Sequence, residues 1–243
     1  MSAKEFTTEQ LADRWMDQRE IQNMMAKFVY CKLFAEHNQL VDRFFASEDD
    51  ITLGVNEGYY VGREAIKAYY RAIWNNAEQR AALMKELFPK FLGKYSDEEL
   101  HGVGSVNVDA LTTCVIELSG DGKTAKGLWY VLGQDNDIYE YGPYSMVTHG
   151  YMAADFIREG DDWKIWHLQD VEDIKCPTGT DWSTDPGMPE ILPQFSRLAN
   201  LSLPEPTVKQ VIREHYSSTR EFTPLAKVPE PYYTFADTFS YGI

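Results

Sequence analysis

Two short segments constrain the fold of this chain more than any other feature. Residues 40–73, LVDRFFASEDDITLGVNEGYYVGREAIKAYYRAI, have the pattern of a helix end, a short strand, a glycine turn and a second helix. Residues 155–170, DFIREGDDWKIWHLQD, have the pattern of a β-hairpin that turns at Glu159-Gly160-Asp161-Asp162. Because the helices precede most of the strands and do not alternate with them as βαβ units, the sequence predicts an α+β fold.

The residues around these segments extend the same pattern. Apolar residues at helical spacing predict a long helix from Thr8 to about Leu33, and residues 65–95 predict a helix that is followed by a shorter one. Alternating apolar and polar residues predict two antiparallel hairpins, 112–118 with 124–132 and 146–157 with 163–170.

The composition changes near Cys176, which divides the chain into residues 1–175 and a Pro- and aromatic-rich extension, residues 176–243. Disordered segments are usually poor in aromatic residues, whereas this one ends in PYYTFADTFSYGI. We therefore expect an extended C-terminal arm that packs on its own domain or on a neighbouring subunit. Within it, residues 208–216 are expected to form a short helix.

The charge and the motifs narrow the function. The net charge of −15 argues against a nucleic-acid partner, because binding phosphate backbones requires clustered Lys and Arg. No apolar run is long enough for a secretory signal or a membrane span, so a cytoplasmic location is expected. The chain has no phosphate loop, dinucleotide fingerprint, zinc motif or nucleophile elbow. These absences favour chemistry without a cofactor, or simple binding.

Histidines are the natural candidates for proton transfer at neutral pH. His101 lies at the start of the strand region, whereas His37 and His215 are expected to be structural or exposed. Side-chain alternation predicts that His167 shares a face with Trp163 and Ile165, opposite Trp166 and Leu168.

The two opening segments resemble the SnoaL-like branch of the nuclear transport factor 2-like superfamily. The resemblance extends over residues 11–174 and rests on diffuse patterns. It implies N-terminal helices packed on a strongly curved antiparallel sheet that forms a cone-shaped pocket for a small apolar molecule. It also implies a homo-oligomer, either a dimer or a trimer.

The resemblance also suggests catalytic residues. His101 matches the family's acid/base histidine, and Asp135 matches a second acid/base group near the end of the next strand. Where the family commonly has an Asp on the first helix, this chain has Leu33, and the adjacent Lys32 is the candidate replacement. An amine in an apolar pocket can be shifted toward neutrality and act as an acid or base.

Aromatic residues suit a planar or aromatic ligand, whose orientation is set by a few hydroxyl or carboxyl groups. The candidate substrate-binding residues are Tyr30, Tyr60, Trp129, Trp166 and Asp170.

The leading hypothesis is a cofactor-independent lyase that acts on an apolar, aromatic alcohol by His/Asp acid-base catalysis. It would eliminate water as SnoaL-like dehydratases do, or formaldehyde as the similar diarylpropane lyases do. The alternatives are a non-catalytic ligand-binding or scaffold protein of the same fold, and an isomerase or cyclase acting on a polyketide or steroid.

Overall fold

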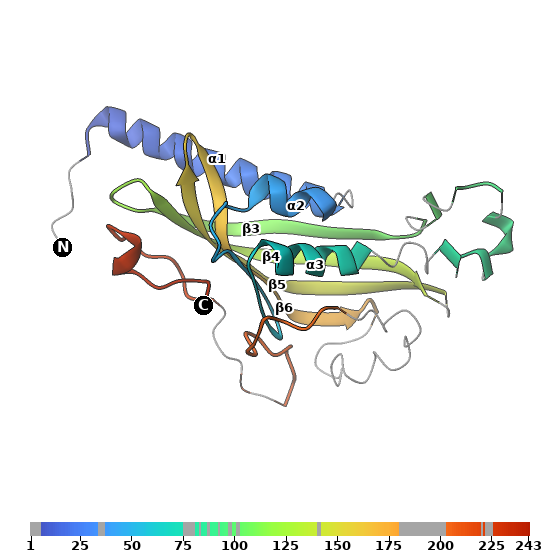
Figure 1. The fold of residues 1–243 in the computed structure, drawn as a ribbon. Coiled ribbons are helices and arrows are strands. Elements are labelled where there is room, and N and C mark those ends of the chain that lie inside the picture. Colours follow the sequence, from blue (N-terminus) through green and yellow to red (C-terminus); the bar gives the residue numbers. More distant parts are fainter. Residues whose placement is uncertain are drawn as a thin grey trace.

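The computed structural model confirms an α+β fold in which N-terminal helices pack on a curled sheet (Figure 1). It describes residues 6–33, 37–74, 81–82, 84–86, 88–91, 93–96, 99–100, 103–139, 142–179, 203–219, 221 and 226–243.

Three helices lie on one side of the sheet (Figure 1). They are α1 (Thr8–Leu33), α2 (His37–Phe44) and α3 (Arg63–Trp74), and short 3-10 turns form at Pro89–Phe91 and Phe235–Asp237. Helix α1 starts at Thr8 because Thr7 and Gln10 each bond the other's backbone amide, which satisfies donors that the first turn leaves free. Helix α3 follows Gly62, whose φ of 81° favours glycine.

A seven-stranded sheet forms the other layer, in the order β3-β4-β5-β6-β1-β2-β7. Every pairing in it is antiparallel except that of β1 with β6, which is parallel. The strands are β1 (Thr52–Val55), β2 (Gly58–Val61), β3 (Val106–Leu118), β4 (Thr124–Tyr139), β5 (Gly142–Glu159), β6 (Asp162–Pro177) and β7 (Val208–Lys209).

Three register shifts interrupt the long meander from β3 to β6, and such bulges bend strands and increase their twist. The shift after His149 needs a glycine at position 150, because a Cβ there would lie 1.9 Å from the carbonyl oxygen of Val171. At the shift between Asp155 and Phe156, β6 has one extra residue, so the side chains on either side of it no longer follow strict alternation between the two faces. Together these irregularities curl the sheet around the helices.

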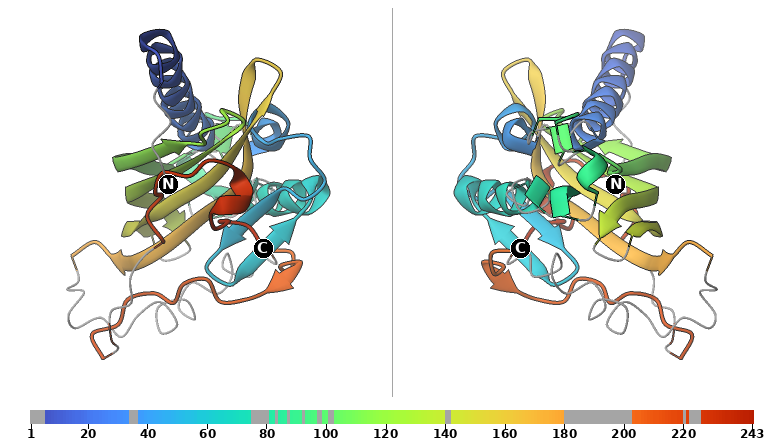
Figure 2. Two further views of the ribbon diagram at one scale, coloured as in Figure 1. Left: turned by 90° about the vertical axis from the view of Figure 1, so that its left-hand side faces the viewer. Right: turned by 90° about the vertical axis from the view of Figure 1, so that its right-hand side faces the viewer.

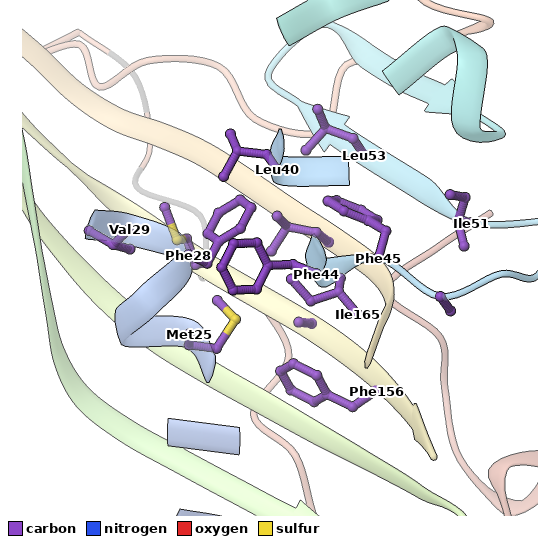
Figure 3. Packing of buried hydrophobic residues seen from close by; sticks show 14 of the residues in the cluster. Met25, Phe28, Val29, Leu40, Phe44, Phe45, Ile51, Leu53, Phe156 and Ile165 are labelled. Atoms are coloured by element: carbon purple, nitrogen blue, oxygen red, sulfur yellow. The ribbon is translucent and has the colours of Figure 1, made fainter. Parts of the chain in front are cut away.

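The main core lies between the helices and the inner face of this sheet (Figure 3). Phe28 of α1 is fully buried and meets the rings of Phe44 and Phe45 edge-on, at centroid distances of 5.7 Å and 6.4 Å. Phe156 and Ile165 complete this contact from β5 and β6. The helices are therefore fixed to the sheet mainly by burial of apolar area, at about 25 cal/mol per Å².

The bulge in β6 makes one sequence prediction wrong. Ile165 and Leu168 both belong to the main core, although strict alternation would put them on opposite faces. His167 instead joins Asp155, a residue of a buried cluster that the C-terminal segment covers. The extra residue at the register shift explains the change.

The arm also differs from its predicted local structure. Residues 208–216 are extended where a helix was expected, and β7 pairs with β2 at the edge of the sheet (Figure 2). The amide of Ile212 donates to the carbonyl oxygen of Asn56 at 2.8 Å, and the amide of Gln210 donates to that of Glu57. Carbonyl groups at the open edge of the sheet thus accept the hydrogen bonds of this segment. In a helix, the segment's own carbonyl groups would accept them.

The last residues of the chain cover the outer face of the sheet, close to the turn between β3 and β4 (Figure 1). They enclose an ion pair between Lys126 and Asp155, in which both side chains are fully buried. Asp155 also accepts hydrogen bonds from the hydroxyl of Ser240 at 3.0 Å and from the amide of Tyr241 at 2.8 Å. The Lys126 ammonium lies over four aromatic rings, those of Tyr232, Phe235, Phe239 and Tyr241.

This cluster gives a stability prediction. Lys126→Met should lower the free energy of unfolding by about 3–5 kcal/mol, because it leaves the buried Asp155 carboxyl without the ammonium that pairs with it. Urea denaturation at neutral pH measures the loss. Lys123→Met is the matched control, since Lys123 is exposed on the turn before β4, and it should change stability by less than about 0.5 kcal/mol. Equal stability of the Lys126 variant and the wild type would contradict the proposed role of the pair.

Candidate functional site

A lysine held between two aspartates forms the centre of the candidate site. The Lys32 Nζ lies 3.0 Å from Asp109 Oδ2 and 2.7 Å from Asp170 Oδ2. Lys32 belongs to the last turn of α1, while Asp109 and Asp170 belong to strands β3 and β6. All three side chains are partly accessible, at 22–25%. The site is thus assembled from elements that are far apart in the sequence.

The two aspartates decide the charge of Lys32. Burial disfavours the ammonium, but Asp109 and Asp170 outweigh this effect, and the pKa of Lys32 is well above its ordinary value. This direction is opposite to the shift toward neutrality suggested above for an amine in an apolar pocket. Lys32 therefore acts as a fixed cation at neutral pH and is unsuited to be a base.

The pKa of Asp170 is raised, whereas the pKa of an ordinary ion-paired carboxyl is lowered. Burial and the neighbouring Asp109 raise its pKa, and the contact with Lys32 only partly offsets them. Asp170 thus retains its proton at a higher pH than a solvated aspartate does, which is the property needed in a proton donor.

Tyrosines of α3 add hydroxyl groups close to this cluster. Burial raises the pKa of Tyr69 and Tyr70, and the charge of Asp170 raises it further. The ring of Tyr60 on β2 lies 4.8 Å from that of Tyr69. The pKa of Tyr60 is raised to about 12, mainly by burial, and its hydroxyl donates to the carbonyl oxygen of Pro204 at 2.7 Å. These phenols therefore stay neutral, and those of Tyr69 and Tyr70 can donate hydrogen bonds near the charged groups.

A second ion-pair chain is formed by β4 and β6. The Lys175 Nζ lies 2.9 Å from Glu172 Oε1 and 3.5 Å from Asp135 Oδ2. Burial alone would raise the pKa of Glu172, but Lys175 and His215 lower it to about 2. Burial dominates at Asp135 and raises its pKa. Two carboxyl groups on one lysine are thus shifted in opposite directions, as in acid and base partners.

The structure brings together some of the predicted residues. Lys32 and Asp170 are in direct contact, and the charge of Lys32 also acts, as a minor cause, to lower the pKa of Asp135. His101 lies outside the described residues. The roles assigned to all these residues stay predictions.

The aromatic residues predicted to bind a substrate lie in different parts of the fold. Trp129 lies in the main core with Val131, as two-residue alternation predicts, and packs on Phe156. Trp166 donates from Nε1 to Asp50 at 2.7 Å and stacks on His167. Tyr30 is 59% exposed on α1.

Five residues in the two ion-pair groups and beside them were not predicted from the sequence. On β6, the two-residue spacing of Asp170 and Glu172 continues from Leu168 and was a usable signal. The Tyr-Tyr pair on α3 was visible in the sequence, but nothing in the sequence indicated which charged residues it would approach. The missed residues are Tyr69, Tyr70, Asp109, Glu172 and Lys175.

The model of the SnoaL-like domain family matches residues 13–169 of the chain. The chain belongs to this SnoaL-like family. The match confirms the resemblance inferred from the two opening segments. It ends just before Asp170, so Glu172, Lys175 and the arm lie beyond the matched region.

Two solved structures are similar to the chain. One is described as LinA, with 14% identity over 70% of this chain and 95% of that chain, at a TM-score of 0.50. Another is the hexachlorocyclohexane dehydrochlorinase LinA-type3 from Novosphingobium barchaimii, with 15% identity over 70% of this chain and 95% of that chain, at 0.49. At such identities the likeness concerns the fold alone. No curated protein matches the chain.

Two further observations bear on the class of protein. Within the described residues, no group of three or more His, Cys, Asp or Glu side chains is arranged to hold a metal ion. No helix in that part of the chain is long and apolar enough to cross a membrane.

The lowered pKa of Glu172 predicts a pH dependence of stability. Its pKa falls from an ordinary 4.5 to about 2, so the ionised group stabilises the fold above its ordinary pKa, and this contribution is lost on acidification. Glu172→Gln should therefore lose less stability than the wild type between about pH 5 and pH 2. Urea denaturation across this range measures the difference. The exposed Glu9 of α1 provides the control Glu9→Gln, and parallel curves for the wild type and Glu172→Gln would contradict the assignment.

Proposed function

We propose that the protein is a cofactor-independent lyase acting on an apolar, aromatic small-molecule alcohol. The observation that carries the proposal is the Lys32 ammonium held between Asp109 and Asp170, beside the neutral phenols of Tyr69 and Tyr70. A fixed cation, protonatable carboxyls and phenol donors form a preorganised environment for charge that develops on a leaving oxygen.

In the proposed dehydration, His101 removes a proton from the carbon next to the carbinol carbon. The released electron pair forms the carbon-carbon double bond while the carbon-oxygen bond breaks. Asp170 or Asp135 gives its proton to the leaving oxygen, which departs as water, and Lys32 stabilises the negative charge that builds up there. All bonds and protons balance without a metal or coenzyme.

The same groups serve the elimination of formaldehyde. His101 then takes the hydroxyl proton of a hydroxymethyl group. The bond between the hydroxymethyl carbon and its neighbouring carbon breaks, and formaldehyde leaves. The carbon that keeps the electron pair takes the proton of the acid. Which bond breaks depends on how the substrate is oriented beside Lys32 and Asp170, where Tyr60 packs on Tyr69.

The proposal extends to the setting of the protein. Its substrate is a small molecule and its partner is a second or third copy of the same chain, as the family resemblance implies. The net charge of −15 is consistent with a cytoplasmic protein that has no nucleic-acid partner.

Lys32→Met tests the role of the cation. Turnover should fall by about a hundredfold, the usual effect of removing one electrostatic donor from a transition state. The assay is product formation from a panel of benzylic and diaryl alcohols, followed by liquid chromatography. Lys27→Met on the exposed side of the same helix is the control and should keep full turnover.

A panel that yields ligand binding but no product would favour the alternative, a non-catalytic binding protein. Full turnover by Lys32→Met would remove the lysine from the mechanism.

His101→Ala tests the predicted base. General acid-base catalysis contributes about a hundredfold or more, so turnover should fall by at least this factor. Circular dichroism of the variant checks that the fold is retained. A rate equal to that of the wild type would show that His101 takes no part in proton transfer.

A further inference from the structure

The arm is fixed against the wall of the candidate site by contacts on both sides of His215. The side chain of Arg213 bonds Asp173 from Nε at 2.6 Å, and both residues are buried. The amide of Tyr216 donates to the carbonyl oxygen of Asp173 at 2.6 Å. His215, between these anchors, is thus held beside β6.

Asn56 makes this placement specific. Its side-chain amide donates to the carbonyl oxygens of Glu172 and Arg213, at 2.6 Å and 3.1 Å, and its Oδ1 accepts from the amide of Glu172. One side chain in the turn between β1 and β2 therefore ties the arm to the residue of β6 that His215 faces.

His215 continues the ion-pair chain of the site. Its Nε2 lies 3.7 Å from Glu172 Oε2. Glu172 is bound by Lys175, which in turn reaches Asp135. A histidine near the C-terminus is thereby connected through two intermediate side chains to a predicted catalytic carboxyl.

We propose that the arm completes the site and that His215 is a positioning residue, which controls how Lys175 is shared between Glu172 and Asp135. The His215 side chain satisfies part of the Glu172 carboxylate and leaves Lys175 available to Asp135. When His215 is absent, Glu172 competes more strongly for Lys175. The proton affinity of Asp135 then increases, because its neighbouring cation is withdrawn.

The described residues place several other charged groups near His215. Arg213 is engaged by Asp173, and Glu214 is an exposed neighbour on the arm itself. Strand β6 contributes Glu172 and Lys175 to the chain of ion pairs, and β4 contributes Asp135. The inference rests on the proposed function only in calling Asp135 catalytic, because the linkage itself is a property of the folded chain.

The test is the titration of Asp135 in the full-length protein, followed through its side-chain carboxyl carbon by ¹³C NMR. His215→Gln should move the titration midpoint of Asp135 upward by about 0.5 pH unit, because the neighbouring cation Lys175 is drawn toward Glu172. His149→Gln is the matched control, because the ring of His149 on β5 packs against that of Tyr130 on β4. An unchanged midpoint in His215→Gln overturns the inference.

Two further measurements keep the test independent of folding and of catalysis. Slow exchange of the Ile212 and Tyr216 amides in His215→Gln shows that the arm is still docked, since both amides bond the domain. In a Glu172→Gln background, His215→Gln should have no further effect on Asp135, and a full effect there would overturn the linkage. If no lyase substrate is found, the proposed function fails while the titration still decides this inference.

Discussion

The structure depends most on strand β6, which joins the long meander β3–β5 to the short strands β1, β2 and β7. It pairs antiparallel with β5 on one side and parallel with β1 on the other. Its alternating side chains serve two different environments. Leu168 and Asp170 face the helices and the candidate site, while Gln169 and Val171 face the C-terminal segment. A shift of one residue in its register would exchange the two sets.

The bulge near Trp166 fixes which set faces which side. It keeps Ile165 and Leu168 in the main core and turns His167 toward Asp155. Asp155 then gathers donors from β4 and the C-terminal segment, which compensates the cost of burying its charge. The C-terminal segment thus covers this part of the outer face, and its aromatic residues surround the buried Lys126.

Charge is distributed unevenly between the two faces. On the outer face, Lys126 and Asp155 are fully buried and closely paired, an arrangement suited to holding the fold. On the helix side, Lys32 and its two aspartates stay partly accessible, and the neighbouring carboxyls have pKa values shifted in both directions. Such divergent shifts in accessible groups are typical of sites that transfer protons. Geometry, more than residue type, distinguishes the two clusters.

The sequence by itself determined the elements with local signals and the family to which they belong. The cap at Thr7, the glycine turn before α3 and the two hairpins are set by neighbouring residues, so their patterns were readable. Lys32 and Asp135 were found by comparison with a family pattern and not from their contacts. The tertiary structure alone decided that Lys32 meets Asp109 and Asp170, and that His215 reaches Glu172. These contacts join residues up to 138 positions apart, and they depend on bulges and on an open sheet edge. Local propensity carries no information about such distant pairings, because the free energy that selects them comes from packing of the whole fold.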